Sequence, residues 1–177
     1  VEFCRRLRGL RGGVIAGEIA REMRGELKQR AEEFGNTQVV EGDGNQLPDL
    51  LKDKDFVKPV VLSLQNSLGT WIGDWREALS AMREVAESGR GEVVISLFCQ
   101  EGLKEHGIPM YESAEELTGE PDLERTDFER GIYRSKIGYR SKWFTRGERE
   151  EMKRILGGQI VAEVKDNPAY YILHVGY

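Results

Sequence analysis

The chain has 177 residues, with 26 Lys or Arg against 31 Asp or Glu, so its formal net charge at pH 7 is −5. This charge disfavours a nucleic-acid partner, and no apolar run approaches the roughly 20 residues that a membrane-spanning helix needs. The two cysteines lie far apart, only two histidines are present and no signal peptide is visible, so we expect no metal site and a cytoplasmic protein.

The first part of the chain alternates helical and extended patterns. Apolar residues at helical spacing predict a helix over 2–11, which leads directly into a strand over 13–18. A second helix is expected over 20–34. Its apolar face carries Ile19, Met23, Leu27, Ala31 and Phe34. A strand over 37–41 follows and stops at Gly-Asp-Gly, after which we expect a polar loop.

The middle of the chain continues this alternation. The continuous apolar run 59–64 is typical of a central parallel strand that is buried on both faces. A helix is expected over 74–88, with Asp74 as its N-cap, and a strand over 92–98. Alternating helices and strands predict an α/β fold with a doubly wound, mostly parallel, Rossmann-like sheet.

The last third of the chain changes character. Residues 100–130 are polar and contain several Gly and Pro, which predicts a loop or short helices, and we expect 100–144 to form a cap over the ligand edge. Thr145 begins a capping box that starts a helix over 146–156. Strands over 159–165 and 169–176 are joined so tightly that they can only form an antiparallel hairpin. No repeat or linker is evident, so we expect one domain over 1–177.

Two acids stand at the ends of neighbouring predicted strands. Glu18 closes the strand over 13–18, and Asp43 follows the strand over 37–41. In open α/β sheets this edge is where ligands bind. Carboxylates accept hydrogen bonds and suit a vicinal diol, so the pair suggests a nucleoside held by its ribose and its base. Alternatively, Glu18 stabilises a helix N-terminus and Asp43 is a turn residue.

The order and spacing of these motifs resemble the class I S-adenosylmethionine-dependent methyltransferases. The resemblance covers nearly the whole chain and rests on the segments 17–23, 41–48, 62–69, 84–96 and 139–145, with the terminal hairpin. One departure concerns the family's first strand and Gly-x-Gly-x-Gly loop, which would lie before residue 1. We therefore expect an N-terminally truncated chain whose sheet lacks its first, central strand.

The resemblance also implies roles for particular residues. Glu18 would accept hydrogen bonds from the ribose hydroxyls, and Asp43 would accept one from the adenine amino group. The remaining implied cofactor contacts are Ile19, Met23, Gly44, Asn45 and Gln65. Met23 could instead belong to the core, and Asn45 could simply be a solvated loop residue.

Three further residues are implied contacts of the methyl acceptor, namely Asn66, Tyr139 and Trp143. The amide of Asn66 could instead satisfy backbone groups of its own loop, and the aromatic residues could form a core under the long segment. No catalytic residue is implied, because the cofactor already carries the reactive group.

The function implied is methyl transfer from S-adenosylmethionine to a small molecule. The absence of an Asn-Pro-Pro-Tyr or Asp-Pro-Pro-Tyr motif after residue 64 disfavours methylation of adenine or glutamine amino groups. A nicotinamide-dependent oxidoreductase is an alternative, against which the terminal hairpin and the Gly-Asp-Gly loop argue. A non-catalytic binding or scaffold protein on the same fold is a second alternative.

Overall fold

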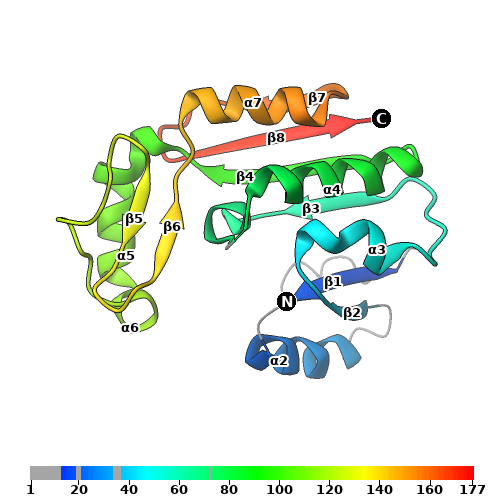
Figure 1. Ribbon diagram of the computed structural model, residues 1–177, viewed down its shortest axis with the longest axis horizontal. Helices are drawn as coiled ribbons and strands as arrows, with labels where there is room; N and C mark the ends of the chain where they lie inside the picture. Colours follow the sequence, from blue (N-terminus) through cyan, green and yellow to red (C-terminus); the bar gives the residue numbers. More distant parts are fainter. Residues whose placement is uncertain (1–12, 19–20, 34–36, 72) are drawn as a thin grey trace. The chain divides into compact units, whose positions relative to one another are not determined.

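The computed structural model describes residues 13–18, 21–33, 37–71 and 73–177, drawn in colour in Figure 1. The chain divides into two compact units, Val1–Lys54 and Asp55–Tyr177. The helix expected over 2–11 and the residues Ile19 and Phe34 lie outside the described part. The expected truncation concerns residues before Val1 and stays a prediction, as does the missing central strand.

The first unit contains a pair of parallel strands joined by a helix. Strands β1 (Val14–Glu18) and β2 (Thr37–Glu41) pair in parallel, with Val14 opposite Thr37 and Glu18 opposite Glu41. Helix α2 (Arg21–Glu32) connects them. These elements confirm the strands expected from the sequence and the described part of the helix.

The segment after β2 differs from the expected polar loop. It forms the 3₁₀ turn η2 (Gly44–Gln46) and the short helix α3 (Leu47–Leu51). Pro48 stands in the first turn, where its missing N–H costs nothing, and Leu51 is buried. A Cβ at Gly42 would lie 2.3 Å from Leu50 Cδ1, so a larger residue there would displace the Leu50 side chain where α3 packs back on the loop.

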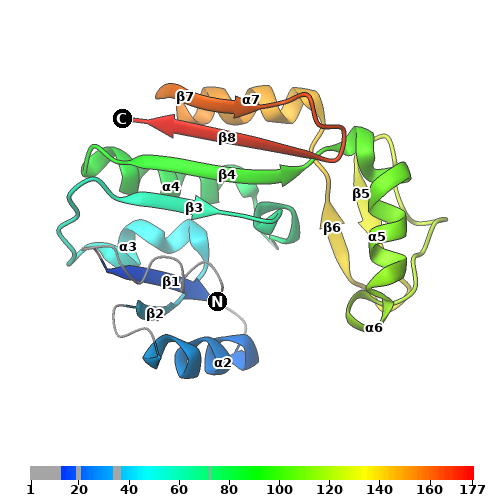
Figure 2. The same cartoon turned by 180° about the vertical axis from the view of Figure 1, so that it is seen from behind.

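The second unit is built on a four-stranded sheet. Its strands are β3 (Val60–Ser63), β4 (Glu92–Phe98), β7 (Gln159–Val164) and β8 (Tyr170–Gly176), in the order β3-β4-β8-β7. Strands β3 and β4 are parallel, whereas β8 runs antiparallel to both of its neighbours, as Figure 2 shows. The predicted parallel strands and C-terminal hairpin are confirmed.

Strand β3 is less buried than its apolar sequence predicts. Within the four-stranded sheet it bonds to β4 alone and forms an edge. Val60 is 55% exposed and Leu62 is 37% exposed. The expectation of a central strand buried on both faces is therefore wrong for β3 in this structure, because no described strand pairs with its other side.

Two helices cover one face of this sheet, as Figures 1 and 2 both show. Helix α4 (Trp75–Ser88) begins at Asp74, whose carboxylate accepts a hydrogen bond from the Arg76 N–H at 3.0 Å. Helix α7 (Arg146–Leu156) begins with the predicted capping box. Helix α4 contacts both β4 and α7, and β4 has three fully buried side chains, those of Val93, Ile95 and Leu97. Both predicted helices are confirmed.

Residues 100–144 form short elements with a core of their own. They comprise η4 (Gln100–Gly102), the π-helical turn η5 (Leu103–Gly107), α5 (Ile108–Ser113), α6 (Glu115–Thr118) and the antiparallel ribbon of β5 (Ile132–Arg134) and β6 (Arg140–Lys142). Short helices are thus confirmed here, while a cap over the ligand edge stays a prediction.

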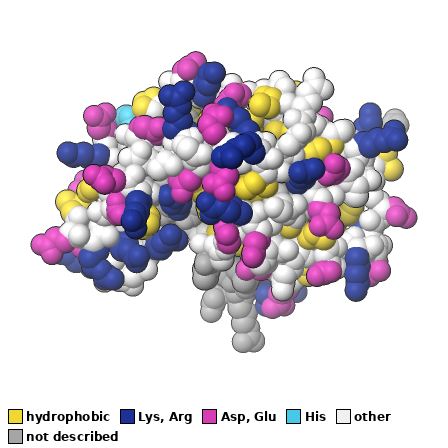
Figure 3. Space-filling view, turned by 45° about the horizontal axis from the view of Figure 1, so that its top comes forward, with side chains coloured by type: hydrophobic (Ala, Val, Ile, Leu, Met, Phe, Trp, Pro, Cys, Tyr) yellow, Lys and Arg dark blue, Asp and Glu magenta, His cyan; other side chains and the backbone are white. Residues whose placement is uncertain are grey.

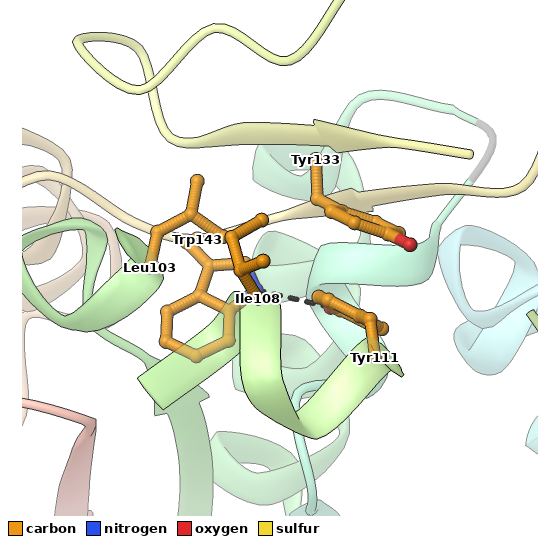
Figure 4. Packing of buried hydrophobic residues seen from close by; sticks show 5 residues of the cluster. All are labelled: Leu103, Ile108, Tyr111, Tyr133 and Trp143. Atoms are coloured by element: carbon orange, nitrogen blue, oxygen red, sulfur yellow. Dashed lines mark hydrogen bonds between the residues drawn. The ribbon is translucent and has the colours of Figure 1, made fainter. Parts of the chain in front are cut away.

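The core of this segment is aromatic, as Figure 4 shows. The rings of Tyr111 and Tyr133 stack with their centroids 3.7 Å apart. Trp143 donates a hydrogen bond from Nε1 to the Tyr111 hydroxyl at 3.0 Å. Leu103 and Ile108 complete the cluster.

Among the described residues, the helices are all too short or too polar to cross a membrane.

Candidate functional site

The first unit brings two of the predicted acids to one edge of its sheet. Because β1 and β2 are parallel and in register, their carboxyl ends coincide. Glu18 is the last residue of β1, and Asp43 follows two residues after the end of β2. The backbone positions of Glu18 and Asp43 therefore share the edge where ligands bind in open α/β sheets.

The loop that carries Asp43 is closed by its own backbone. The Asp43 N–H donates to Gln46 Oε1 at 3.3 Å, and the Asp43 carbonyl accepts from the Gln46 N–H at 2.9 Å. Gly44 and Asn45 lie inside this turn, with Asn45 exposed and Gly44 half-buried. The turn is thus a capping box, in which the Gln46 side chain accepts from the Asp43 N–H and the Asp43 side chain caps the Gln46 N–H, in addition to the backbone bond between the two residues.

Two further predicted cofactor residues cannot be placed. Ile19 lies outside the described residues, as does the side chain of Met23 in α2. Their roles stay predictions.

The turn after β3 has an unusual backbone. Gln65 and Asn66 both adopt the left-handed conformation, with φ of 53° and 61°. Such angles are uncommon for residues other than glycine. The Gln65 N–H donates to Ser96 Oγ at 2.7 Å, and its side chain is exposed. Strained turns of this kind cluster at functional sites.

Asn66 fastens this turn to two other segments. Its Oδ1 accepts a hydrogen bond from the Phe98 N–H at 3.0 Å. Its Nδ2 donates to the Lys142 carbonyl at 2.9 Å and to Ser141 Oγ at 3.2 Å. The residue is 1% exposed. In this structure the amide therefore bonds to groups of β4 and β6 rather than to backbone groups of its own loop, and its contact with an acceptor stays a prediction.

A pocket of about 370 Å³ lies beside the same turn, inside the second unit. One wall comes from the turn and the start of α4, and the other from the outer face of the β5–β6 ribbon. Charged residues before β5 and at the start of α7, Glu129, Arg130 and Glu148, also line it. Its lining includes Leu68, Trp71, Trp75, Ile132, Arg140 and Lys142. Backbone of η3 (Ser67–Thr70) reaches β6 so closely that a Cβ at Gly69 would lie 2.3 Å from the Lys142 carbonyl oxygen.

One cation of the pocket is paired and another is not. Lys142 Nζ lies 2.9 Å from Glu148 Oε1 and also donates to the Arg130 carbonyl. Glu148 in turn accepts from the N–H and the hydroxyl of Thr145, both at 2.9 Å, in the capping box of α7. The guanidinium of Arg140, in contrast, has no hydrogen bond or ion pair with any described residue.

Comparison with known proteins gives matches at the level of structure alone. No protein-family model matches the sequence, and no curated protein is detectably similar to it. The protein PH0226 from Pyrococcus horikoshii OT3 aligns over 98% of this chain and 76% of its own length, with a TM-score of 0.64 and 14% identity. A SAM-dependent methyltransferase from Aquifex aeolicus aligns over 98% and 75%, with a TM-score of 0.58 and 12% identity.

A third solved structure, an O-methyltransferase family protein from Burkholderia thailandensis, aligns over 98% of this chain, with a TM-score of 0.62 and 10% identity. The chain spans only 46% of that protein. The chain has the class I methyltransferase fold. At such low identities the likeness establishes the fold, and the site must be argued from this chain's own residues.

On this methyltransferase fold, Tyr139 and Trp143 belong to the aromatic core. Trp143 is 1% exposed, and the Tyr139 ring lies 6.0 Å from that of Tyr111 and 6.2 Å from that of Tyr133. Burial raises the pKa of Tyr139 above its ordinary value. The alternative expectation, a core under the long segment, describes both residues here, and contact with an acceptor stays a prediction.

Sequence reasoning missed the residues that line the pocket. Alternation along β6 provides the signal: Tyr139, Ser141 and Trp143 point into the core, so Arg140 and Lys142 must face the other way. No sequence pattern predicts that Trp71 lines the pocket, because its position beside the ribbon depends on the strained turn after β3.

Proposed function

We propose that this protein transfers a methyl group from S-adenosylmethionine to a small-molecule acceptor. One observation carries the proposal: on a methyltransferase fold, the parallel register of β1 and β2 brings the positions of Glu18 and Asp43 to the same sheet edge. That edge is where an α/β sheet binds a nucleotide-like ligand.

The residues at this edge would hold the adenosine half of the cofactor. The Glu18 carboxylate would accept hydrogen bonds from the two ribose hydroxyls, and Asp43 would accept one from the adenine amino group. Gly44 and Asn45 would lie along the base, because the closed Asp43–Gln46 turn presents them at the same edge. Ile19 and Met23 would complete the adenosine site, and Gln65 would contact the cofactor from the turn after β3.

When bound, S-adenosylmethionine would supply an electrophilic methyl group, with the electron pair of the broken carbon–sulfur bond left on sulfur. A proton carried by the acceptor atom would be released to solvent. The residues of this chain would bind and orient the cofactor and the acceptor and would exclude water from the reacting atoms. No side chain is assigned as a general base.

The acceptor would bind in the pocket beside the turn after β3. A volume of about 370 Å³ suits a small molecule. Asn66 would hold that turn in shape, while Tyr139 and Trp143 would support the pocket wall from behind or contact a larger acceptor. We further propose that the protein works in the cytoplasm and has no nucleic-acid partner, in keeping with its net charge of −5.

Calorimetric titration with S-adenosylhomocysteine tests the proposal, with NADH as the competing cofactor. The titration is made on the 177-residue chain and on the product of the complete reading frame. Saturable binding of S-adenosylhomocysteine, with none of NADH, is the expected result. If neither form binds it while circular dichroism shows both to be folded, the methyltransferase proposal fails and a scaffold role replaces it.

A further inference from the structure

The outer face of the β5–β6 ribbon is cationic. In the antiparallel register Ile132 stands opposite Lys142, and Arg134 stands opposite Arg140. Side chains alternate along a strand, so these four share one face while Tyr133 and Ser141 point into the core. Lys and Arg side chains gather at the lower left of Figure 3, over the part of the molecule that Figure 1 shows to carry β5 and β6.

The two arginines of this face form no ion pair with the described residues, although the carboxylates Glu129 and Glu148 also line the pocket. Like charges directly opposite each other on neighbouring strands are destabilising. Neither Arg134 nor Arg140 makes a side-chain hydrogen bond or an ion pair with any described residue, whereas Lys136 and Lys142 pair with Glu120 and Glu148. Arg140 lines the pocket, and its guanidinium, a forked donor, has no partner among the described residues.

The opposite wall of the pocket is apolar and aromatic. Leu68 is 2% exposed and Trp75 is 9% exposed, and both line the pocket together with Trp71. The indole Nε1 of Trp71 is buried and has no hydrogen-bond partner among the residues that the structure describes. A buried donor without a partner costs free energy, which a ligand acceptor atom would recover.

We infer that the molecule bound in this pocket combines an apolar or aromatic body with an anionic group, a carboxylate or a phosphate, that Arg140 binds. The body lies against Leu68, Trp71 and Trp75. Arg134 adds to the positive potential from the neighbouring strand without lining the pocket. This inference rests on the proposed function, because it names the chemical class of the methyl acceptor.

Indole N–H signals in ¹H–¹⁵N spectra test the inference directly. Trp71 and Trp75 line the pocket, whereas the Trp143 N–H is bonded to Tyr111 in the core and serves as an internal reference. The protein is titrated separately with benzoate, phenyl phosphate and the neutral benzamide. A Trp71→Phe variant identifies the Trp71 signal.

We expect a saturable shift of the Trp71 signal with at least one anion, an unmoved Trp143 signal and little response to benzamide. Stronger binding of phenyl phosphate would assign a phosphate, and stronger binding of benzoate a carboxylate. Arg140→Gln should weaken the anion affinity about tenfold, since a charge-assisted hydrogen bond is lost. Arg154→Gln, at an exposed position of α7 outside the pocket, is the matched control and should bind as the unmodified protein does.

Equal responses to benzamide and the anions, no response to either anion, or an unchanged affinity in Arg140→Gln would overturn the inference. Binding of S-adenosylhomocysteine is measured on the same samples. If that ligand binds and the anions do not, the acceptor class is wrong while methyl transfer stands. If the anions bind through Arg140 and neither the 177-residue chain nor the product of the complete reading frame binds S-adenosylhomocysteine, the anion pocket stands and the methyltransferase proposal fails.

Discussion

The side-chain carbonyl of Asn66 accepts a hydrogen bond from the backbone N–H of Phe98 at 3.0 Å. This bond joins the turn after β3 to the last residue of β4. The same amide also reaches the backbone of β6. One buried side chain therefore fixes the distance between the sheet and the ribbon that forms the pocket's second wall.

Replacement of Asn66 by alanine should destabilise the second unit by roughly 3 kcal/mol, because the Phe98 N–H loses its partner and alanine is strained at a positive φ. Urea unfolding followed by tryptophan fluorescence measures the change. Asn66→Gly tolerates the backbone conformation but lacks the amide, so it should recover only about 1 kcal/mol of the loss. Equal stability of Asn66→Ala and the unmodified protein would contradict the bonding described for this turn.

Removal of the Tyr111 hydroxyl should also be costly. In Tyr111→Phe the Nε1–H of Trp143 remains buried without an acceptor, and we expect a loss of about 1–3 kcal/mol in the free energy of unfolding. Tyr170→Phe is the control, because Tyr170 is 43% exposed. Comparable effects of the two changes would show that the bond to Trp143 contributes nothing.

The buried tyrosines make stability depend on alkaline pH. Burial raises the pKa of Tyr111 to about 12 and that of Tyr177 to about 12, against about 10 for an unfolded tyrosine. Their neutral form is favoured in the fold, so their contribution is complete below about pH 10 and is lost as the pH rises toward about 12. The urea midpoint should fall across this window, and it should fall less steeply in Tyr111→Phe. A midpoint that is constant from pH 10 to 12 would argue against both shifts.

The regular elements could be predicted because local signals and tertiary structure agree. The capping box at Thr145 sets the start of α7, and the tight joint between β7 and β8 permits only an antiparallel hairpin. Helix α3 escaped prediction because its five residues are too few to show a period, and its packing on Gly42 is a tertiary contact. The exposure of β3 also escaped prediction, because an apolar run does not report which neighbours a strand has.

The candidate site was only partly open to sequence reasoning. The positions of Glu18 and Asp43 follow from parallel strand ends, which a pattern of alternating elements predicts. The pocket could not be predicted in this way, because the residues that line it come from η3 and from the β5–β6 ribbon, which lie far apart in the sequence. Asn66 illustrates the difficulty: its sequence position suggested an acceptor contact, whereas its hydrogen bonds show it holding two segments together.

Asp43 offers the sharpest test of the proposed cofactor site. The bonds made by the N–H and the carbonyl of Asp43 do not involve its side chain, so Asp43→Ala removes only the carboxylate's share of the capping box and should leave the fold intact. Asp43→Ala should weaken the affinity for S-adenosylhomocysteine by at least tenfold, because a hydrogen bond to a charged group is worth about 1.5–3 kcal/mol. Asp49→Ala, at an exposed position of α3, is the matched control. Calorimetry gives both affinities, and thermal unfolding checks that the variants are folded. If Asp43→Ala binds as tightly as Asp49→Ala, the carboxylate serves only the turn, and the adenine must be held by other groups of the same edge.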